Sequence, residues 1–363
     1  MGVSVAIIKP ADNGCNLQCR YCYVEGQTPK TKLMSVDTGK IIVDNLFNQQ
    51  DVQYVEFLWH GGEPLLRGIP FYEEIFEYQK TVATSCNKKY VNAFQTNLTL
   101  LDNEWLDFFK KHNITISTSL DGSQRLHDIN RVTSGGIGTF GIIKDKIELA
   151  QSRGFNVNVL CVVSKTNVDF PEEVCDSFNA LGINHVGFLP CYKTDNRNIV
   201  HPSLSPGEYG SFMTRVFDLF LDKKLTFEVR EFEQFFGGVI GHPQDICSFT
   251  GHCTHFICIN SDGDVFSCDT SPQDDDHLFG NILKTSLQEL LRSSKYTAFS
   301  CRTQQIPSSC KQCRFFTHCH NGCFNMRTNG TYRFCEDRKA LYTYFEHLIR
   351  KINAEREYLY DVN

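Results

Sequence analysis

Residues 13–22, Asn-Gly-Cys-Asn-Leu-Gln-Cys-Arg-Tyr-Cys, place three cysteines in the spacing C-x₃-C-x₂-C directly after a short β-rich run, Val3–Lys9. Three thiolates on one short loop can bind three irons of a cubane cluster and leave the fourth iron without a protein ligand. An open coordination position is what a catalytic metal centre needs, whereas a structural site is closed. The alternative for Cys15, Cys19 and Cys22 is a zinc loop completed by a distant ligand.

The chain of 363 residues has an ordinary globular composition, with 41% hydrophobic and 21% charged residues, which argues against a disordered or fibrous protein. The 36 basic and 42 acidic residues give a net charge of −6, so we expect no nucleic-acid partner. The absence of a signal peptide or a long apolar run predicts a cytoplasmic protein without a membrane partner. In a reducing compartment, the 17 cysteines indicate metal or iron–sulfur ligands rather than disulfides.

The first two-thirds of the chain alternates between short β-rich runs and amphipathic helical stretches. Pro70 and Pro171 suit first helical positions, Asp102 suits an N-cap, and Gly154 and Gly182 suit helix ends. The predicted strands, each rich in Val, Ile or Phe, are Val3–Lys9, Gln53–Trp59, Tyr90–Gln95, Ile114–Ser119, Phe155–Val163 and Asn184–Leu189. This order predicts an α/β fold with parallel strands, either an incomplete barrel or a doubly wound sheet.

After about residue 235 the chain becomes rich in cysteine and poor in long apolar stripes. Phe256–Cys268 reads as a hairpin turning at residues 261–264, and helices are predicted near Ser286–Phe299 and Asp337–Ile352. Such a region is expected to be stabilised by metal rather than by a large core. We therefore predict two domains, residues 1–235 and residues 236–363.

The cysteine triad, with aromatic Tyr21 directly before its last member, resembles the signature of the radical S-adenosylmethionine (SAM) superfamily. The resemblance implies a partial (β/α)₆ barrel and a [4Fe–4S] cluster whose open iron binds SAM, from which one electron generates a 5′-deoxyadenosyl radical. Gly-Gly-Glu-Pro at residues 61–64 is only a turn when read alone, but its position matches the family's motif for the SAM amino group. By resemblance, the cofactor-binding residues are Tyr21, Gly61, Gly62, Glu63, Asn97, Ser119 and Arg131; a surface salt bridge is the alternative for Arg131.

The later cysteines resemble the SPASM extension of radical SAM enzymes, which carries two auxiliary [4Fe–4S] clusters. The resemblance assigns Cys247, Cys253, Cys268 and Cys323 to the first auxiliary cluster. It assigns Cys310, Cys313, Cys319 and Cys335 to the second. Four thiolates close each cluster, so both are expected to serve structure and electron transfer. A pair of zinc sites is the alternative, because C-x₂-C is also zinc spacing.

Asp269 directly follows Cys268. In anaerobic sulfatase-maturating enzymes, which this chain resembles in its cysteine spacings, the aspartate at this place is a general base on the substrate side chain. The alternative is that Asp269 caps a turn. A base needs hydrogen-bond reach to its substrate and a suitable pKa, and a sequence shows neither.

Two reactions remain open within the class. The string Trp59-His60-Gly61-Gly62-Glu63-Pro64 looks more like peptide cross-linking maturases, whereas sulfatase maturases more often have glutamine before the glycines. We therefore predict a radical SAM oxidoreductase that modifies or cross-links a ribosomally made peptide. The alternative is a sulfatase maturase that oxidises Cys or Ser to formylglycine.

The expected partners are a peptide or protein substrate and a low-potential electron donor of the flavodoxin or ferredoxin type. Because Cys15 lies so near the start, the barrel mouth, the SPASM region or a separate protein is expected to recognise the substrate. A non-catalytic iron–sulfur electron carrier is the rival of another class, and it leaves the three-cysteine triad unexplained.

Overall fold

The computed structural model describes residues 2–24, 32–192, 194–195, 198–199 and 202–361. The chain divides into two compact units. Unit 1 comprises Met1–Leu160 and His252–Gln304, and unit 2 comprises Cys161–Gly251 and Gln305–Asn363. Each unit therefore combines residues from the predicted barrel with residues from the cysteine-rich region.

A largely parallel sheet forms the centre of unit 1. Its strands follow the order β12-β11-β10-β1-β2-β3-β4-β5. Their bounds are β1 (Val5–Ile8), β2 (Tyr54–Trp59), β3 (Lys89–Thr96), β4 (Thr115–Ser119), β5 (Val157–Val163), β10 (Phe256–Ile259), β11 (Asp264–Phe266) and β12 (Leu278–Asn281). From β1 to β5 the spatial order follows the chain and the pairs are parallel. This is the singly wound order of a barrel, whereas a doubly wound sheet reverses direction.

The predicted hairpin of the cysteine-rich region is present, but it belongs to this sheet. β10 pairs in parallel with β1, from Val5 opposite Phe256 to Ile8 opposite Ile259, and antiparallel with β11. Cys258 is fully buried in an apolar cluster with Ile7 and Phe266. The hairpin thus covers an edge of β1 that would otherwise expose unpaired backbone groups.

In unit 1, helices α1, α3, α10 and α11 begin at a Ser or Asp side chain that caps them. Their bounds are α1 (Val36–Phe47), α2 (Ile69–Cys86), α3 (Asn103–Lys111), α4 (Gln124–Asn130), α5 (Phe140–Ser152), α10 (Leu287–Leu290) and α11 (Ser294–Thr303). Asp102 accepts a hydrogen bond from the Trp105 backbone N–H at 3.0 Å, which confirms the predicted N-cap. The single helix predicted near Ser286–Phe299 is two helices, because Ser286 caps α10 and Ser293 starts a new helix by capping α11.

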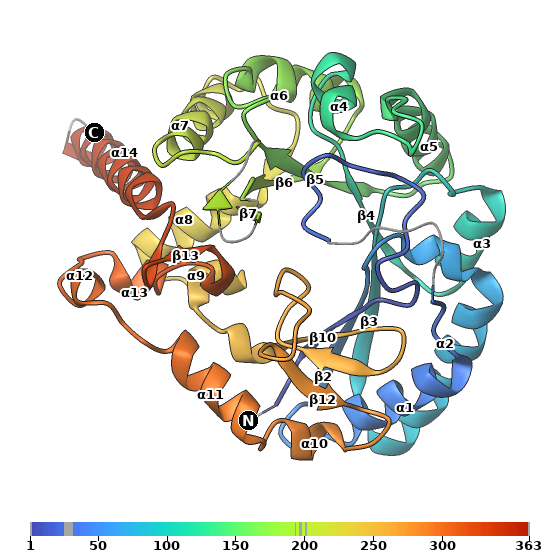
Figure 1. The fold of residues 1–363 in the computed structure, drawn as a ribbon. Helices are drawn as coiled ribbons and strands as arrows, with labels where there is room; N and C mark the ends of the chain where they lie inside the picture. Colours follow the sequence, from blue (N-terminus) through green and yellow to red (C-terminus); the bar gives the residue numbers. More distant parts are fainter. Residues whose placement is uncertain (1, 25–31, 193, 196–197, 200–201, 362–363) are drawn as a thin grey trace. The chain divides into compact units, whose positions relative to one another are not determined.

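An aromatic layer packs the sheet of unit 1 against α2 and α3, which lie along its outer side (Figure 1). Trp59 from β2 and Phe94 from β3 both contact the ring of Tyr72 in α2, with centroids 5.2 and 4.9 Å apart. Because successive strand side chains point to opposite faces, Leu58 and His60 lie on the other side of the sheet from Trp59. The aromatic layer therefore fixes which residues at the end of β2 face away from the helices.

Unit 2 contains the short parallel pair β6 (His185–Pro190) and β9 (Glu228–Val229) and two small hairpins. The hairpins are β7 (Thr194–Asp195) with β8 (Asn198–Ile199) and β13 (Arg327–Thr328) with β14 (Thr331–Tyr332). Its helices are α6 (Pro171–Ala180), α7 (Glu208–Leu221), α8 (Arg230–Ile240), α9 (Cys247–Thr250), α12 (Ser308–Lys311), α13 (Phe316–Cys319) and α14 (Cys335–Asp361). Helix α14 is longer than the predicted Asp337–Ile352.

Helix α14 is joined to α7 by polar and aromatic contacts. The carboxylate of Asp337 accepts hydrogen bonds from the backbone N–H groups of Gly207 and Gly210 at 2.8 and 2.7 Å, at the beginning of α7. The rings of Phe217 and Phe345 lie 4.5 Å apart. In the described part of the chain, no helix is both long enough and apolar enough to cross a membrane.

We predict that Phe94→Ala lowers the free energy of unfolding by about 3–5 kcal/mol, because it opens a cavity in a fully packed aromatic layer. Ile137→Ala is the matched control, since the Ile137 side chain is 69% exposed and its truncation is expected to cost less than about 0.5 kcal/mol. Urea denaturation of both variants in the same cluster-loaded state, followed by tryptophan fluorescence, measures the difference. Equal midpoints for the two variants would contradict the packing described here.

Candidate active site and cluster-binding cysteines

The cysteine loop, residues 12–22, follows β1 and is held by backbone hydrogen bonds to the segment after α4. The Gln18 N–H donates to the Val132 carbonyl at 2.8 Å, and the Arg20 N–H donates to the Asn130 carbonyl at 2.9 Å. Cys15, Cys19 and Cys22 are all partly exposed thiols. The structure thus brings the triad to the carboxyl end of β1, the end at which barrel enzymes place their chemistry.

The glycines of the Gly-Gly-Glu motif let the backbone at the end of β2 touch the cysteine loop. The Gly62 N–H donates to the Asp12 carbonyl at 2.9 Å, and the Glu63 N–H donates to the Gly14 carbonyl at 2.8 Å. A Cβ atom at Gly62 would lie 1.9 Å from the Gly14 carbonyl oxygen, so no other residue fits there. The two glycines therefore let the backbone after β2 approach the loop that carries the cysteines.

The Glu63 carboxylate is buried and accepts three hydrogen bonds. The donors are the Leu65 N–H at 2.9 Å, the Thr96 hydroxyl at 2.6 Å and the Asn97 N–H at 2.8 Å. Burial raises the pKa of Glu63 to about 7, and the three hydrogen bonds oppose that rise. Glu63 therefore ties the end of β3 to the motif after β2, and its expected contact with the SAM amino group stays a prediction.

Asn97 and Ser119 lie at the carboxyl ends of neighbouring strands, as the sequence predicts. The Asn97 side-chain N–H₂ donates to the Asn16 side-chain oxygen at 2.9 Å and lies 3.7 Å from the Cys15 sulfur. The Ser119 hydroxyl accepts a hydrogen bond from the Gln95 amide at 3.1 Å. Asn97 thus contacts the cysteine loop directly, whereas the assignment of both residues to SAM stays a prediction.

Arg131 forms a buried ion pair, not the surface salt bridge weighed as the alternative. Its guanidinium bonds both carboxylate oxygens of Asp121, at 3.0 and 3.3 Å. The Tyr21 hydroxyl donates to the same carboxylate, and the Arg131 guanidinium lies over the Tyr21 ring, 5.2 Å from its centroid. Burial alone would lower the pKa of Arg131, but the charge of Asp121 raises it.

Asp121 is therefore a site residue that sequence reasoning did not single out. The signal was its place two residues after Ser119, at the end of a predicted strand. Its single carboxylate holds both Tyr21 and Arg131, two residues that the sequence assigned to the cofactor independently of each other.

The donor set of the cysteine loop fits an iron–sulfur cluster. Burial raises the pKa of Cys15 to about 12 and that of Cys19 to about 11, so thiolates at these positions need a bound cation. Within the described residues, no three cysteines bring their sulfur atoms within 4.8 Å of one another. Tetrahedral zinc requires sulfur separations of about 3.8 Å. The described cysteines are therefore not arranged as a tetrahedral zinc site.

Asp269 lies beside the cysteine loop, and Tyr23, His60 and Cys268 contact its carboxylate. The Tyr23 hydroxyl donates to Asp269 Oδ2 at 2.6 Å. His60 Nε2 lies 3.7 Å from that oxygen and 3.4 Å from the Tyr23 hydroxyl. Burial alone would raise the pKa of Asp269, but His60, Tyr23 and Cys268 together lower it, so the carboxyl group is ionised at neutral pH.

The sequence analysis singled out Asp269 but missed Tyr23, and it named His60 only as part of the Trp-His-Gly-Gly-Glu-Pro string. The signal that could have found Tyr23 was its position next to a cluster cysteine. Tyr23 directly follows Cys22, and Asp269 directly follows Cys268.

In unit 2, the four cysteines assigned to the second auxiliary cluster line one pocket. Cys310, Cys313, Cys319 and Cys335 surround about 410 Å³ of empty space, counting the part that is open to solvent. The buried guanidinium of Arg338 lies 3.9 Å from the Cys319 sulfur. This cation suits the negative charge that a four-thiolate cluster carries.

The cysteines assigned to the first auxiliary cluster are divided between the units. Cys253 and Cys268 belong to unit 1, whereas Cys247 and Cys323 belong to unit 2. That ligand set therefore stays a prediction.

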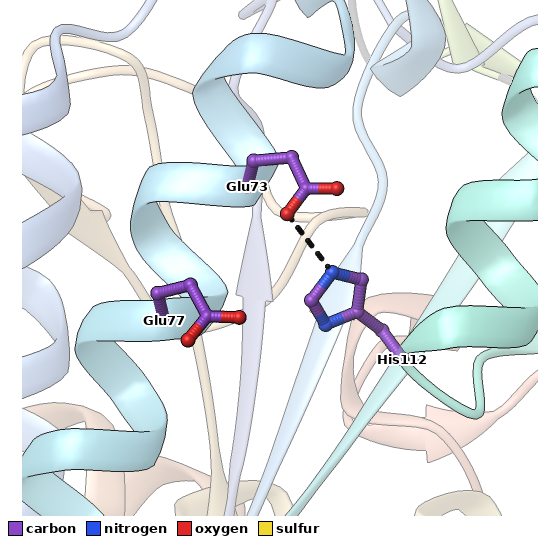
Figure 2. Close-up of side chains that lie close together, drawn as sticks. All are labelled: Glu73, Glu77 and His112. Carbon is purple, nitrogen blue, oxygen red and sulfur yellow. Dashed lines mark hydrogen bonds and ion pairs between the residues drawn. The ribbon is translucent and has the colours of Figure 1, made fainter.

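Figure 2 shows a further cluster, made by Glu73 and Glu77 of α2 and by His112, the residue that ends α3. The Glu73 carboxylate accepts from Lys111 Nζ at 2.6 Å and lies 3.2 Å from His112 Nε2. Because Lys111 already neutralises Glu73, the arrangement is a surface ion-pair network on the outer helices.

Comparison with known proteins agrees with this geometry. The model of the radical SAM superfamily matches residues 12–188, and that of the SPASM iron–sulfur cluster-binding domain matches residues 247–314. A cysteine-type anaerobic sulfatase-maturating enzyme of Clostridium novyi is 30% identical over 366 residues, 95% of each chain. A serine-type enzyme of Bacteroides thetaiotaomicron is 29% identical, covering 94% of this chain and 88% of its own length.

The chain belongs to the anaerobic sulfatase-maturating family of radical SAM/SPASM enzymes. The solved structure of anSMEcpe with bound AdoMet superposes with a TM-score of 0.87 at 28% identity, covering 96% of this chain and 99% of that one. The same enzyme has been solved with AdoMet and the Cp18Cys peptide, with a TM-score of 0.85.

As a member of this family, the protein is a radical SAM oxidoreductase that modifies a residue of a peptide or protein. Its cofactors are SAM and three [4Fe–4S] clusters, as the sequence predicted. The fold class predicted from the sequence, a radical SAM domain with a C-terminal SPASM domain, is confirmed.

We predict that Gly62→Ala selectively loses the cluster of the triad, because the added methyl group displaces the Gly14 backbone of the cysteine loop. Iron and sulfide analysis after anaerobic reconstitution is expected to show one of the three clusters missing. Gly141→Ala, where a Cβ atom meets nothing within 4 Å, is expected to keep all of them. A full complement of iron in Gly62→Ala would show that the loop tolerates the displacement.

Proposed function

We propose that this protein is a sulfatase maturase that oxidises a cysteine or serine side chain of its substrate to formylglycine. One observation carries the proposal: a carboxylate, Asp269, is held by the Tyr23 hydroxyl at 2.6 Å beside the loop of the radical-generating cysteines. Its relatives named as sulfatase-maturating enzymes align with nearly the whole chain.

The sequence alone favoured a peptide cross-linking maturase, because of its Trp-His-Gly-Gly-Glu-Pro string. The relatives reverse that preference, since both serine-type and cysteine-type sulfatase-maturating enzymes match at 28–30% identity over 94–96% of the chain. A six-residue string carries less weight than an alignment of this length.

Bound SAM, reduced by one electron at the triad cluster, supplies the radical that removes a hydrogen atom from the substrate carbon. In this proposal, Cys15, Cys19 and Cys22 hold that cluster. The buried Arg131–Asp121 pair and Ser119 orient the SAM carboxylate, and backbone carbonyls of Gly61 and Gly62 receive its amino group. The ion pair fixes the Arg131 side chain before SAM binds, so less side-chain conformational entropy is lost on binding.

Asp269 is the proposed general base, which takes the proton of the substrate thiol or hydroxyl group. From serine, loss of the hydrogen atom, the proton and one electron gives the aldehyde directly; from cysteine it gives a thioaldehyde, which water hydrolyses to the aldehyde with release of sulfide. An acceptor within hydrogen-bond reach contributes about 10²–10⁴-fold to a rate.

The electron released from the substrate is proposed to leave through the two auxiliary clusters. An external flavodoxin or ferredoxin is proposed to reduce the triad cluster. We also propose that the two domains span residues 1–235 and 236–363 and that the protein is cytoplasmic.

We predict that the reconstituted enzyme, given SAM, reductant and a sulfatase-type peptide bearing the target Cys or Ser, forms an aldehyde. Mass spectrometry with an aldehyde-trapping reagent detects it. Asp269→Asn is expected to lower the aldehyde yield about 100-fold or more while 5′-deoxyadenosine is still released. Asp276→Asn, on the exposed part of the same segment, is the matched control and is expected to behave like the wild type.

Two outcomes would reject the proposal. Release of 5′-deoxyadenosine without aldehyde from either peptide would point to the cross-linking alternative. A protein that carries its clusters but never cleaves SAM would be an electron carrier.

A further inference from the structure

His60 directly follows the carboxyl end of β2 and lies on the face of the sheet opposite to the aromatic layer. Its side chain is 22% exposed, and that of Asp269 is 14% exposed. Because the neighbouring Trp59 side chain is packed among the rings of α2, the direction of the His60 side chain is set by the pleat of β2.

The Tyr23 hydroxyl donates its proton to Asp269, and His60 Nε2 is a second polar atom within reach of the hydroxyl oxygen. The hydroxyl oxygen lies 2.6 Å from Asp269 Oδ2 and 3.4 Å from His60 Nε2, and 3.7 Å separate His60 Nε2 from the same carboxylate oxygen. The three side chains therefore form a closed triangle around Asp269 Oδ2. The His60 ring thereby adds a second polar contact to the Tyr23 hydroxyl, beside the hydrogen bond to Asp269.

The other carboxylate oxygen, Oδ1, faces the sulfur of Cys268. Asp269 Oδ1 lies 3.1 Å from the Cys268 sulfur, and a cysteine that binds iron as a thiolate has no S–H to donate. With Oδ2 occupied by Tyr23, Oδ1 is the oxygen that can accept a substrate proton.

We propose that His60 is a positioning residue of the substrate site, whose ring holds the Tyr23 hydroxyl and through it directs Oδ1 of Asp269 toward the substrate side chain. This inference rests on the proposed function, because it concerns the base of that reaction. It adds His60, which directly follows β2, to Tyr23 and Asp269, which each follow a cysteine assigned to a cluster.

The ring acts through contact and not through charge. The charged and titratable groups around it are Asp269, Tyr23 and Lys9 at the end of β1. Burial lowers the pKa of His60 below its usual 6.5 and Lys9 lowers it further, whereas Asp269 raises it. His60 Nε2 lies 3.4 Å from the Tyr23 hydroxyl and is the ring atom that can form a hydrogen bond with it.

The test compares His60→Leu, which removes the polar atom, with His60→Gln, which keeps an amide group of similar reach. Both are measured as holoenzymes on a sulfatase-type peptide. His60→Leu is expected to lower kcat for aldehyde formation about ten- to a hundredfold, the loss typical of a misplaced catalytic group. KM is expected to change less than about threefold, and more 5′-deoxyadenosine is released per aldehyde. His60→Gln is expected to restore most of kcat.

A double-mutant cycle tests the route through Tyr23. If His60 acts by holding the Tyr23 hydroxyl, His60→Leu has little further effect in a Tyr23→Phe background. Additive losses, a wild-type kcat in His60→Leu, or a His60→Gln variant as impaired as His60→Leu would each overturn the proposal. If His60→Leu does not retain its clusters, the comparison of His60→Gln with His60→Asn, whose amide is one carbon shorter, replaces it; equal activity of these two would overturn the proposal.

Failure of the proposed function is recognised separately. If the wild type releases 5′-deoxyadenosine but forms no aldehyde, the formylglycine proposal fails. Crystal structures of wild-type and His60→Leu holoenzymes then decide on His60. A Tyr23 hydroxyl that stays within hydrogen-bond distance of Asp269 without the histidine ring overturns the inference, and a hydroxyl turned away supports it.

Discussion

The backbone contact between residues 61–63 and the cysteine loop is the constraint on which the rest of the site depends. Two N–H groups after β2 donate to carbonyls of Asp12 and Gly14, and Gly62 has no room for a side chain. Fixing a loop in one geometry costs conformational entropy. Contacts with neighbouring segments must therefore hold the three cysteines in place. The residues after β2 hold the cysteine loop in place. The buried carboxylate of Glu63 also accepts hydrogen bonds from Thr96 and Asn97, which connects these residues to the end of β3.

Buried charge around the loop is balanced locally. Asp121 neutralises Arg131 and accepts a hydrogen bond from the Tyr21 hydroxyl, so two side chains from separate segments share one carboxylate. A buried ion pair of this kind contributes orientation more dependably than stability, because desolvation offsets much of its attraction. In unit 2, Arg338 is the cation next to Cys319.

The addition of β10 and β11 to the edge of β1 explains how a carboxylate from the cysteine-rich region reaches the radical site. The parallel pairing of β1 and β10 fixes the register of the hairpin, and Cys268 and Asp269 follow β11 directly. Tyr23 and His60 can then contact Asp269 although they lie more than two hundred residues earlier in the chain. Sheet pairing, and not a loop insertion, therefore supplies this part of the site.

The sequence by itself determined the cofactor chemistry and the fold class. Cysteine spacing, the Gly-Gly-Glu turn and the alternation of strands and helices are local patterns, and each depends on residues close together in the chain. Strand and helix positions followed from the same local rules, except where two serines, Ser286 and Ser293, restart a helix.

Only the tertiary structure decided which side chains meet. It joined the hairpin of the cysteine-rich region to β1, paired Arg131 with Asp121 and placed Tyr23 and His60 against Asp269. Side-chain partners distant in sequence are set by sheet register and by the face of the strand that each residue occupies. Neither can be read from one segment alone.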